Sequence, residues 1–242
     1  MDKIAKLKDM IGQSKRIVAF SGAGISTESG IADFRSENGI FNTVRKYGYN
    51  PETLLSHSFF LQNTEVFFKY YKENFLVTKA QPNAAHKALA AMEKSGKLSA
   101  VITQNVDGLH TRAGSKNVYE LHGSIYRNYC MRCHKFHPVE YIQEAEGIPY
   151  CDCGGIVKPD VVLYEESLDE NVLQGAMESV MQADMLVVCG SSLVVYPAAG
   201  LIPLYKGDKL VIINKTETPR DESAGLVIHD SLGKVLGECV EV

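Results

Sequence analysis

The chain has 242 residues, of which 45% are hydrophobic and 22% are charged, and its formal net charge at pH 7 is -4. This composition is that of a globular protein with a sizeable core, and the weak negative charge argues against general affinity for nucleic acid or anionic membranes. Residues 1–13 mix charged and apolar positions, which predicts an amphipathic helix and not a signal peptide. No run approaches the roughly 20 apolar residues that cross a bilayer, so we expect a soluble, cytoplasmic protein without nucleic-acid or membrane partners.

Predicted strands and helices alternate along the chain. Residues 16–20 predict a strand that runs into a glycine turn opening a helix, and residues 36–55 have a polar, loop-like composition. Apolar periodicity predicts helices within 58–76, 83–95 and 231–238. Short apolar runs predict strands at 98–103, 185–189, 210–213 and 227–228, and we expect another short strand at 118–120.

Several of these strands are apolar without two-residue alternation, which is typical of strands buried on both faces. We therefore predict an α/β fold, a Rossmann-like parallel sheet with helices on both faces. Polar residues stand at the carboxyl ends of four strands, where ligands bind in open parallel sheets: Ser21, Gln104, Ser191 and Asn214.

The turn after the first strand, residues 21–27, suits the phosphates of a dinucleotide. Gly22 and Gly24 permit a tight turn and close approach to a pyrophosphate, and the amides that follow point at the anion. Gly190 ends a second apolar run in the same way. A glycine turn that only joins a strand to a helix has the same local pattern, so this assignment depends on the other motifs.

Four of the six cysteines form two close pairs, Cys130-x-x-Cys133 and Cys151-x-Cys153. Four thiolates make a closed tetrahedral set for Zn²⁺, which is a structural site because no coordination position stays open. Two unrelated cysteine pairs, or a redox pair, are the alternative. We predict one structural zinc ion per chain, held in a small zinc-binding module.

Three further motifs are polar and specific: Asp33-Phe34-Arg35, the run 103–110 (TQNVDGLH) and His122-Gly123. Together with the two glycine turns and the four cysteines, they stand in the order found in sirtuins. The chain resembles that family of NAD-dependent protein-lysine deacylases from about residue 16 to its end. The resemblance implies a Rossmann-like fold that uses NAD as a co-substrate.

The resemblance also implies which residues contact NAD. The phosphates lie over the first glycine turn, Phe34 shields the reactive sugar from water, and Asp107 reads the nicotinamide carboxamide. The full implied set is Gly22, Ala23, Gly24, Ser26, Thr27, Asp33, Phe34, Arg35, Gln104, Asn105, Val106, Asp107, His122, Gly190, Ser191, Ser192, Asn214, Lys215, Ser231 and Leu232.

By the same resemblance, catalysis is assigned to His122 and Asn105. His122 takes a proton from a ribose hydroxyl. The acetyl group passes from acetyl-lysine to ADP-ribose, which makes the enzyme a transferase that releases nicotinamide and O-acetyl-ADP-ribose. A mono-ADP-ribosyltransferase and a non-enzymatic NAD- or acyl-lysine-binding module are the alternatives.

Residues 158–166 match the sirtuin segment that pairs with an extended peptide, with Val162, Leu163, Tyr164 and Glu165 as the substrate contacts. The negative charge of Glu165 leads us to expect basic residues beside the target lysine. Relatives that remove succinyl groups carry a Tyr-x-x-Arg pair. This chain has Phe68 and Tyr71 in those places, which predicts acetyl in preference to succinyl.

We expect one catalytic domain over residues 1–242, acting as a monomer on an acetylated protein or peptide. Its large Rossmann-like part covers about 1–35, 80–124 and 158–242. Its small module combines a helical part, about 36–79, with the zinc part, about 125–157.

Overall fold

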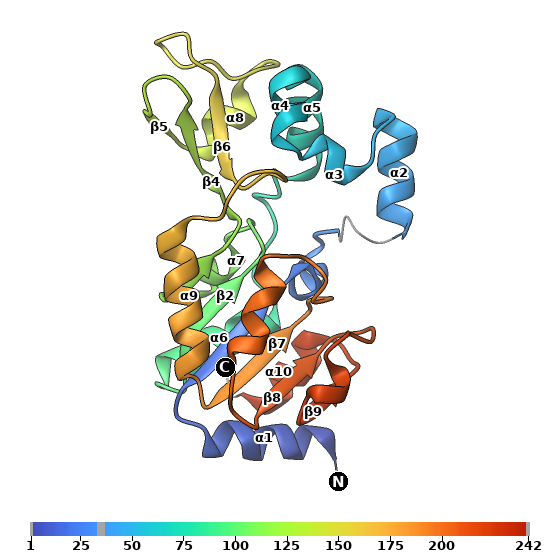
Figure 1. Ribbon diagram of the computed structural model, residues 1–242, viewed down its shortest axis with the longest axis vertical. Coiled ribbons are helices and arrows are strands. Elements are labelled where there is room, and N and C mark those ends of the chain that lie inside the picture. The colour runs from blue at the N-terminus through green and yellow to red at the C-terminus, as the bar shows by residue number, and fades with distance from the viewer. Residues whose placement is uncertain (1, 33–36, 241–242) are drawn as a thin grey trace.

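Two β-sheets organise the computed structural model, which describes residues 2–32 and 37–240 (Figure 1). The larger sheet contains β1 (Ile17–Ser21), β2 (Leu98–Thr103), β3 (Val118–Glu120), β7 (Met185–Cys189), β8 (Leu210–Ile213) and β9 (Leu226–Ile228). These strands are all parallel and lie in the order β3-β2-β1-β7-β8-β9. The predicted parallel sheet is therefore confirmed.

The strand order places a topological switch between β1 and β7. From β1 the chain adds β2 and β3 on one side, and it later adds β7, β8 and β9 on the other. In open parallel sheets a crevice forms outside the carboxyl ends of the two strands at such a switch, because the connections leave in opposite directions. The fold thus directs a ligand to the ends of β1 and β7.

Alternate residues of β1 serve two separate cores, one on each face of the sheet. Ile17 and Ala19 belong to a core that is covered by α1 (Lys3–Gln13), α6 (Ala84–Lys94) and α10 (Leu232–Cys239). Val18 and Phe20 belong to a core that is covered by α9 (Glu170–Gln182) and η2 (Ala198–Leu204). Helices on both faces explain why the strands lack a polar side.

A smaller unit lies above the large sheet in Figure 1. It contains the antiparallel strands β4 (Gly123–Cys130), β5 (Phe136–His137) and β6 (Val157–Val161), with α8 (Val139–Glu144). Helices α4 (His57–Gln62) and α5 (Thr64–Asn74) share a core with it, in which Phe60, Phe67 and Phe68 pack with Ile125 and Ile142. The helices predicted within 58–76 are confirmed, and the cysteine-bearing and helical segments share one hydrophobic core.

The expectation of a loop-like stretch over 36–55 is wrong. The segment forms α2 (Glu37–Tyr47) and α3 (Pro51–Leu54), and Gly48 and Pro51 mark the junction between them. Helix α2 is held by a tertiary contact, because Lys46 and Tyr47 both donate hydrogen bonds to the Glu73 carboxylate of α5. A partner so distant in sequence leaves no local signal.

The remaining short helices are η1 (Ala23–Ser29), α7 (Leu109–Ala113) and η3 (Asp221–Ser223). Across residues 2–32 and 37–240, each helix is too short or too polar to traverse a lipid bilayer.

The carboxyl ends of β1 and β7 meet at glycines. The Gly24 N–H donates to the Gly190 carbonyl at 2.8 Å. A Cβ on Gly24 would lie 2.7 Å from the Gly190 Cα, and a Cβ on Gly190 would lie 2.4 Å from the Ile25 nitrogen. Gly190 also has φ +63°, in the left-handed region that disfavours other residues. Backbone touches backbone here, and only glycine permits it.

We predict that Gly190→Ala lowers the free energy of unfolding by at least about 2 kcal/mol, because it adds left-handed strain and a backbone clash. Gly12→Ala is the matched control. A Cβ on Gly12 in α1 meets no atom within 4 Å, so this change should stabilise the protein by roughly 0.5–1 kcal/mol. Urea unfolding measures both, and equal stabilities for the two variants would contradict the packing described here.

Candidate functional site

A cavity of about 720 Å³ opens at the carboxyl ends of β1 and β7, where the switch in strand order predicts a crevice. Its wall combines the ends of β1, β2 and β7 with the segment after β6 and the corner between α3 and α4. Most of the predicted site residues line it: Gly22, Ala23, Gly24, Ser26, Gln104, Asn105, Val106, Asp107, His122, Val162, Leu163, Tyr164, Glu165, Gly190, Ser191, Ser192 and Asn214.

In the described part of the chain, four predicted site residues do not line this cavity, and three others cannot be placed against it. Asp33, Phe34 and Arg35 lie outside the described ranges. Thr27 donates its hydroxyl proton to the Gly24 carbonyl, and Leu232 is buried in the core under α10. Lys215 and Ser231 also stand outside the lining, although Asn214 is part of it.

The first glycine turn holds the floor of the cavity by backbone contacts. Gly22 N–H donates to the Cys189 carbonyl at 3.1 Å, and Gly24 N–H donates to Gly190. A Cβ on Gly22 would come within 2.9 Å of the Gly190 carbonyl oxygen. The Gly24 amide already has a partner, and the Gly190 backbone occupies the place of its missing side chain, so this turn offers a ligand its backbone alone.

A hydrogen-bonded chain fixes three polar side chains beside this turn. Asn105 Nδ2 donates to Ser26 Oγ at 3.1 Å, and Ser26 Oγ donates to Asp107 Oδ2 at 2.6 Å. The Leu109 N–H donates to the other Asp107 oxygen at 2.9 Å. Burial raises the pKa of Asp107 above its ordinary value, while the Ser26 and Leu109 hydrogen bonds oppose that rise. The carboxyl group is thus immobilised where it lines the cavity.

His122 presents a defined tautomer to the site. Its Nδ1 lies 2.9 Å from the Gln104 carbonyl oxygen. A carbonyl only accepts, so Nδ1 carries the proton of the neutral ring and Nε2 carries the lone pair that can receive another. Gln104 in turn donates its side-chain amide to Ser191 Oγ at 2.9 Å, which links the ends of β2 and β7.

The backbone around His122 crosses from the large sheet to the small one. Gly123 has φ +77°, and a Cβ there would lie 1.9 Å from the Asp160 carbonyl oxygen of β6. Arg127 of β4 forms ion pairs with Glu120 of β3 at 2.6 Å and with Asp160 of β6 at 2.7 Å. The glycine after His122 is therefore required by a strand contact, and the position of the histidine follows from it.

The loop after β6, residues 162–166, forms the opposite wall. The Val162 N–H donates to the His122 carbonyl at 3.0 Å. The Tyr164 N–H donates to the Leu55 carbonyl, and the Tyr164 carbonyl accepts from the His57 N–H. The loop is thus joined to His122 at one end and to the α3–α4 corner further along.

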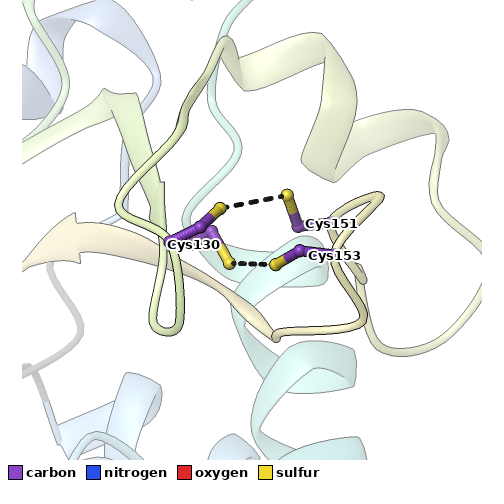
Figure 2. A group of neighbouring side chains, drawn as sticks. Cys130, Cys151 and Cys153 are labelled. Atoms are coloured by element: carbon purple, nitrogen blue, oxygen red, sulfur yellow. Dashed lines mark hydrogen bonds between the residues drawn. The ribbon is translucent and has the colours of Figure 1, made fainter.

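The four cysteines of the two pairs lie together in the small unit (Figure 2). Their sulfur atoms are all within 4.8 Å of one another, with Cys130 and Cys153 at 3.4 Å and Cys133 and Cys151 at 3.7 Å. Four sulfurs at about 2.3 Å from a tetrahedral Zn²⁺ would be about 3.8 Å apart. The arrangement fits a four-coordinate metal ion, and Gly155 leaves room for the Cys130 sulfur, from which a Cβ at 155 would lie only 2.6 Å away.

The Sir2 family model matches residues 22–197. The chain belongs to the Sir2 family. A Clostridium acetobutylicum protein named NAD-dependent protein deacetylase is 58% identical to it over 238 residues, which are 98% of this chain and 97% of that protein.

Two solved Sir2 structures are also similar to this Sir2-family chain. One, a Sir2 variant with a deacetylated p53 peptide and 3'-O-acetyl ADP ribose, has a TM-score of 0.90 at 39% identity and covers 98% of this chain and 99% of that one. The other, Sir2 with a p53 peptide and NAD+, has a TM-score of 0.86 at 40% identity and covers 96% of this chain and 95% of that one. The predicted family is confirmed.

Besides the end of α5 and single residues such as Ile31 and Thr216, sequence reasoning missed two parts of the cavity wall. One is the segment 194–197, in which Val194 is 57% and Tyr196 is 70% exposed. The available sequence signal was a group of apolar residues that follows β7 and leads to Pro197, because a proline seldom continues a strand. The other is the α3–α4 corner, including Pro51 and Leu55, which was expected to be a loop.

Two buried histidines lie beneath the site. The rings of His86 and His110 are 4.9 Å apart, and His110 Nε2 lies 2.9 Å from Ser21 Oγ at the end of β1. Burial lowers the pKa of His86 to about 4 and that of His110 to about 3. Both rings are therefore neutral in the native protein near pH 7.

These shifts predict acid destabilisation with a defined sign. Each histidine binds its proton near pH 6.5 when unfolded but only near 3–4 when folded, so stability is lost as the pH falls below about 6.5. His86→Gln removes one such group, and Gln suits this third helical position of α6 because it can accept from the Asn83 N–H. Between pH 6 and 4.5 the variant should lose roughly 1.2 kcal/mol less per pH unit than the wild type. Urea unfolding at several pH values checks this, and parallel pH profiles would contradict it.

Proposed function

We infer that this Sir2-family chain is an NAD-dependent protein deacetylase that moves the acetyl group of an acetyl-lysine to ADP-ribose. The observation that carries this inference is one cavity that gathers His122, the 104–107 motif and the glycine turn beside the 162–166 loop. The wider resemblance to named protein deacetylases supports the same reaction.

NAD fits the edge formed by the switch between β1 and β7. Gly22 and Gly24 let the turn pack directly on the backbone of Gly190 and Ser191, so phosphates can come close to the backbone here. Asp107 has one carboxylate oxygen held by Ser26 and the other by Leu109, a fixed acceptor pair for a carboxamide. When bound, NAD supplies the ADP-ribose that accepts the acetyl group and nicotinamide as the leaving group. We also propose that Ser191, Ser192 and Asn214 contact the adenosine side, with Lys215, Ser231 and Leu232 nearby and Asp33, Phe34 and Arg35 over the nicotinamide side.

His122 acts as the base. Its proton on Nδ1 is directed to the Gln104 carbonyl, so Nε2 is the atom that receives a proton from a ribose hydroxyl. Asn105 keeps its amide group on the Gly22 carbonyl and Ser26, which holds it beside the same sugar. His122 therefore moves the proton, and Asn105 orients the ribose.

The acetylated peptide lies along Val162, Leu163, Tyr164 and Glu165. Apolar residues of the wall, among them Phe75, Val106 and Leu163, suit the acyl-lysine side chain. Phe68 and Tyr71 are both fully buried in the core and offer no cationic partner to an acyl carboxylate. The apolar lining therefore favours acetyl over succinyl, whose unpaired charge is costly to bury.

We propose that the four-cysteine cluster holds one structural Zn²⁺, a role that its closed thiolate set supports. Thiolates must stay reduced to bind the metal, which supports a cytoplasmic location. The division into a large part (1–35, 80–124 and 158–242) and a small module (36–79 and 125–157), and action as a monomer, complete the proposal.

A single incubation tests the reaction and its alternatives. With NAD and an acetyl-lysine peptide, mass spectrometry should show loss of the acetyl group, one nicotinamide per deacetylated lysine, and faster turnover than on a succinyl-lysine peptide. His122→Ala should lower turnover at least about 100-fold at an unchanged melting temperature. Addition of ADP-ribose to the protein substrate would favour the mono-ADP-ribosyltransferase alternative. NAD binding without nicotinamide release would favour the non-enzymatic binding module.

Zinc content tests the metal proposal separately. The purified protein should carry about one zinc ion per chain, and Cys133→Ala should lose it, because three thiolates bind the metal much less tightly. We expect the melting temperature to fall by at least about 5 °C, since a structural zinc contributes folding energy. Cys239→Ala, at the distant end of α10, is the control that should retain zinc. A metal-free wild type that melts at the same temperature with and without added zinc would contradict the proposal.

A further inference from the structure

The 162–166 loop contains a turn with an unfavourable residue at its tightest point. The Glu166 N–H donates to the Leu163 carbonyl at 3.0 Å, which closes a four-residue turn with Glu165 in its third position. Glu165 has φ +76°, in the left-handed region. Turns with positive φ at this position favour glycine or asparagine, because a side chain there crowds the neighbouring backbone. A glutamate at this place therefore calls for a compensating contact.

Ser58 of α4 provides that contact. Its N–H donates to Glu165 Oε2 and its hydroxyl donates to Glu165 Oε1, both at 2.9 Å. Both carboxylate oxygens are engaged by one residue on the neighbouring element. Hydrogen bonds to an ionised acceptor are stronger than neutral ones. The side chain of Glu165 thus joins the tip of the loop to the start of α4.

The adjacent glutamate has a different task within the loop. Glu166 accepts from the Leu163 N–H at 2.9 Å and from Lys158 Nζ at 3.0 Å, and its other oxygen lies 2.8 Å from His57 Nδ1. Burial opposes its ionisation, yet the Leu163 amide, His57 and Lys158 together hold the pKa of Glu166 below its ordinary value. Glu166 stabilises the base of the turn, which leaves the tip to Glu165.

We propose that Glu165 is a positioning residue for the acylated peptide: through Ser58 it holds the 162–166 loop in its peptide-binding shape before the substrate arrives. The proposal rests on the proposed function, because it assumes that this loop receives the peptide. The loop begins at the carbonyl of His122 and lines the same cavity, so its position sets where the acyl-lysine meets the base. A loop fixed in advance costs the peptide less ordering on binding, and the effect falls on peptide affinity.

The test compares steady-state kinetics of four variants and one control variant with saturating NAD and an acetyl-lysine peptide that has neutral flanking residues. Glu165→Gly removes the contact to Ser58 but keeps the turn, because glycine accepts positive φ. We expect the peptide KM to rise about fivefold to tenfold, with kcat and NAD affinity within about twofold of the wild type. Glu165→Gln keeps acceptor and donor atoms facing Ser58, and it should recover most of the loss.

Ser58→Ala removes one of the two hydrogen bonds and should raise the peptide KM by a smaller factor. Added to Glu165→Gly, it should have no further effect, since the contact is already lost. Glu146→Gly, an exposed acidic residue of the small unit outside the cavity wall, is the charge-matched control.

A peptide KM for Glu165→Gly that equals the wild-type value overturns the proposal. A second result also overturns it. In that result, Glu165→Gln and Glu165→Gly raise the KM equally for a peptide with flanking lysines, and neither variant raises the KM for the neutral peptide. That result would make Glu165 a charge contact for basic substrates. Failure of the wild type to deacetylate any peptide would instead refute the proposed function, so the two failures are distinguishable.

Discussion

The structure depends on the contact between the backbones that follow β1 and β7. Gly24 donates to the Gly190 carbonyl, and neither position has room for a Cβ. The two strands lie side by side at the switch in strand order, so this contact forms the floor of the crevice above them. Gln104 reaches from the next strand to Ser191 and makes the floor continuous. A ligand with phosphates can approach the backbone here because no side chains intervene.

The function proposed for His122 depends on its place between the two sheets. It lies between β3 of the large sheet and β4 of the small one, and the Arg127 ion pairs to Glu120 and Asp160 hold these sheets together around it. The His122 carbonyl accepts a hydrogen bond from Val162, the first residue of the 162–166 loop, and the Gln104 carbonyl orients the His122 ring. The proposed base is thus connected by hydrogen bonds both to the end of β2, where NAD is proposed to bind, and to the 162–166 loop, where the peptide is proposed to bind.

Patterns local in sequence were sufficient for much of this account. The strands of the large sheet follow from continuous apolar runs, and the cysteine cluster follows from spacing alone. Helices α2 and α3 were missed because their support is tertiary, as the contacts of Lys46 and Tyr47 with Glu73 illustrate. The partnership of Gly24 with Gly190 and of Glu165 with Ser58 joins residues far apart in the chain. Single-sequence patterns carry no information on such pairs, so the role of the Gly24 amide could not be foreseen.

The most direct test of the account is a crystal structure of the protein with NAD and an acetyl-lysine peptide. We predict that the pyrophosphate lies over the turn at Gly22 and Gly24, and that His122 Nε2 lies within hydrogen-bond distance of a hydroxyl of the nicotinamide ribose. The peptide should run along the 162–166 loop with its acyl-lysine pointing at that ribose. A dinucleotide bound elsewhere, or a ribose beyond the reach of His122, would contradict the account.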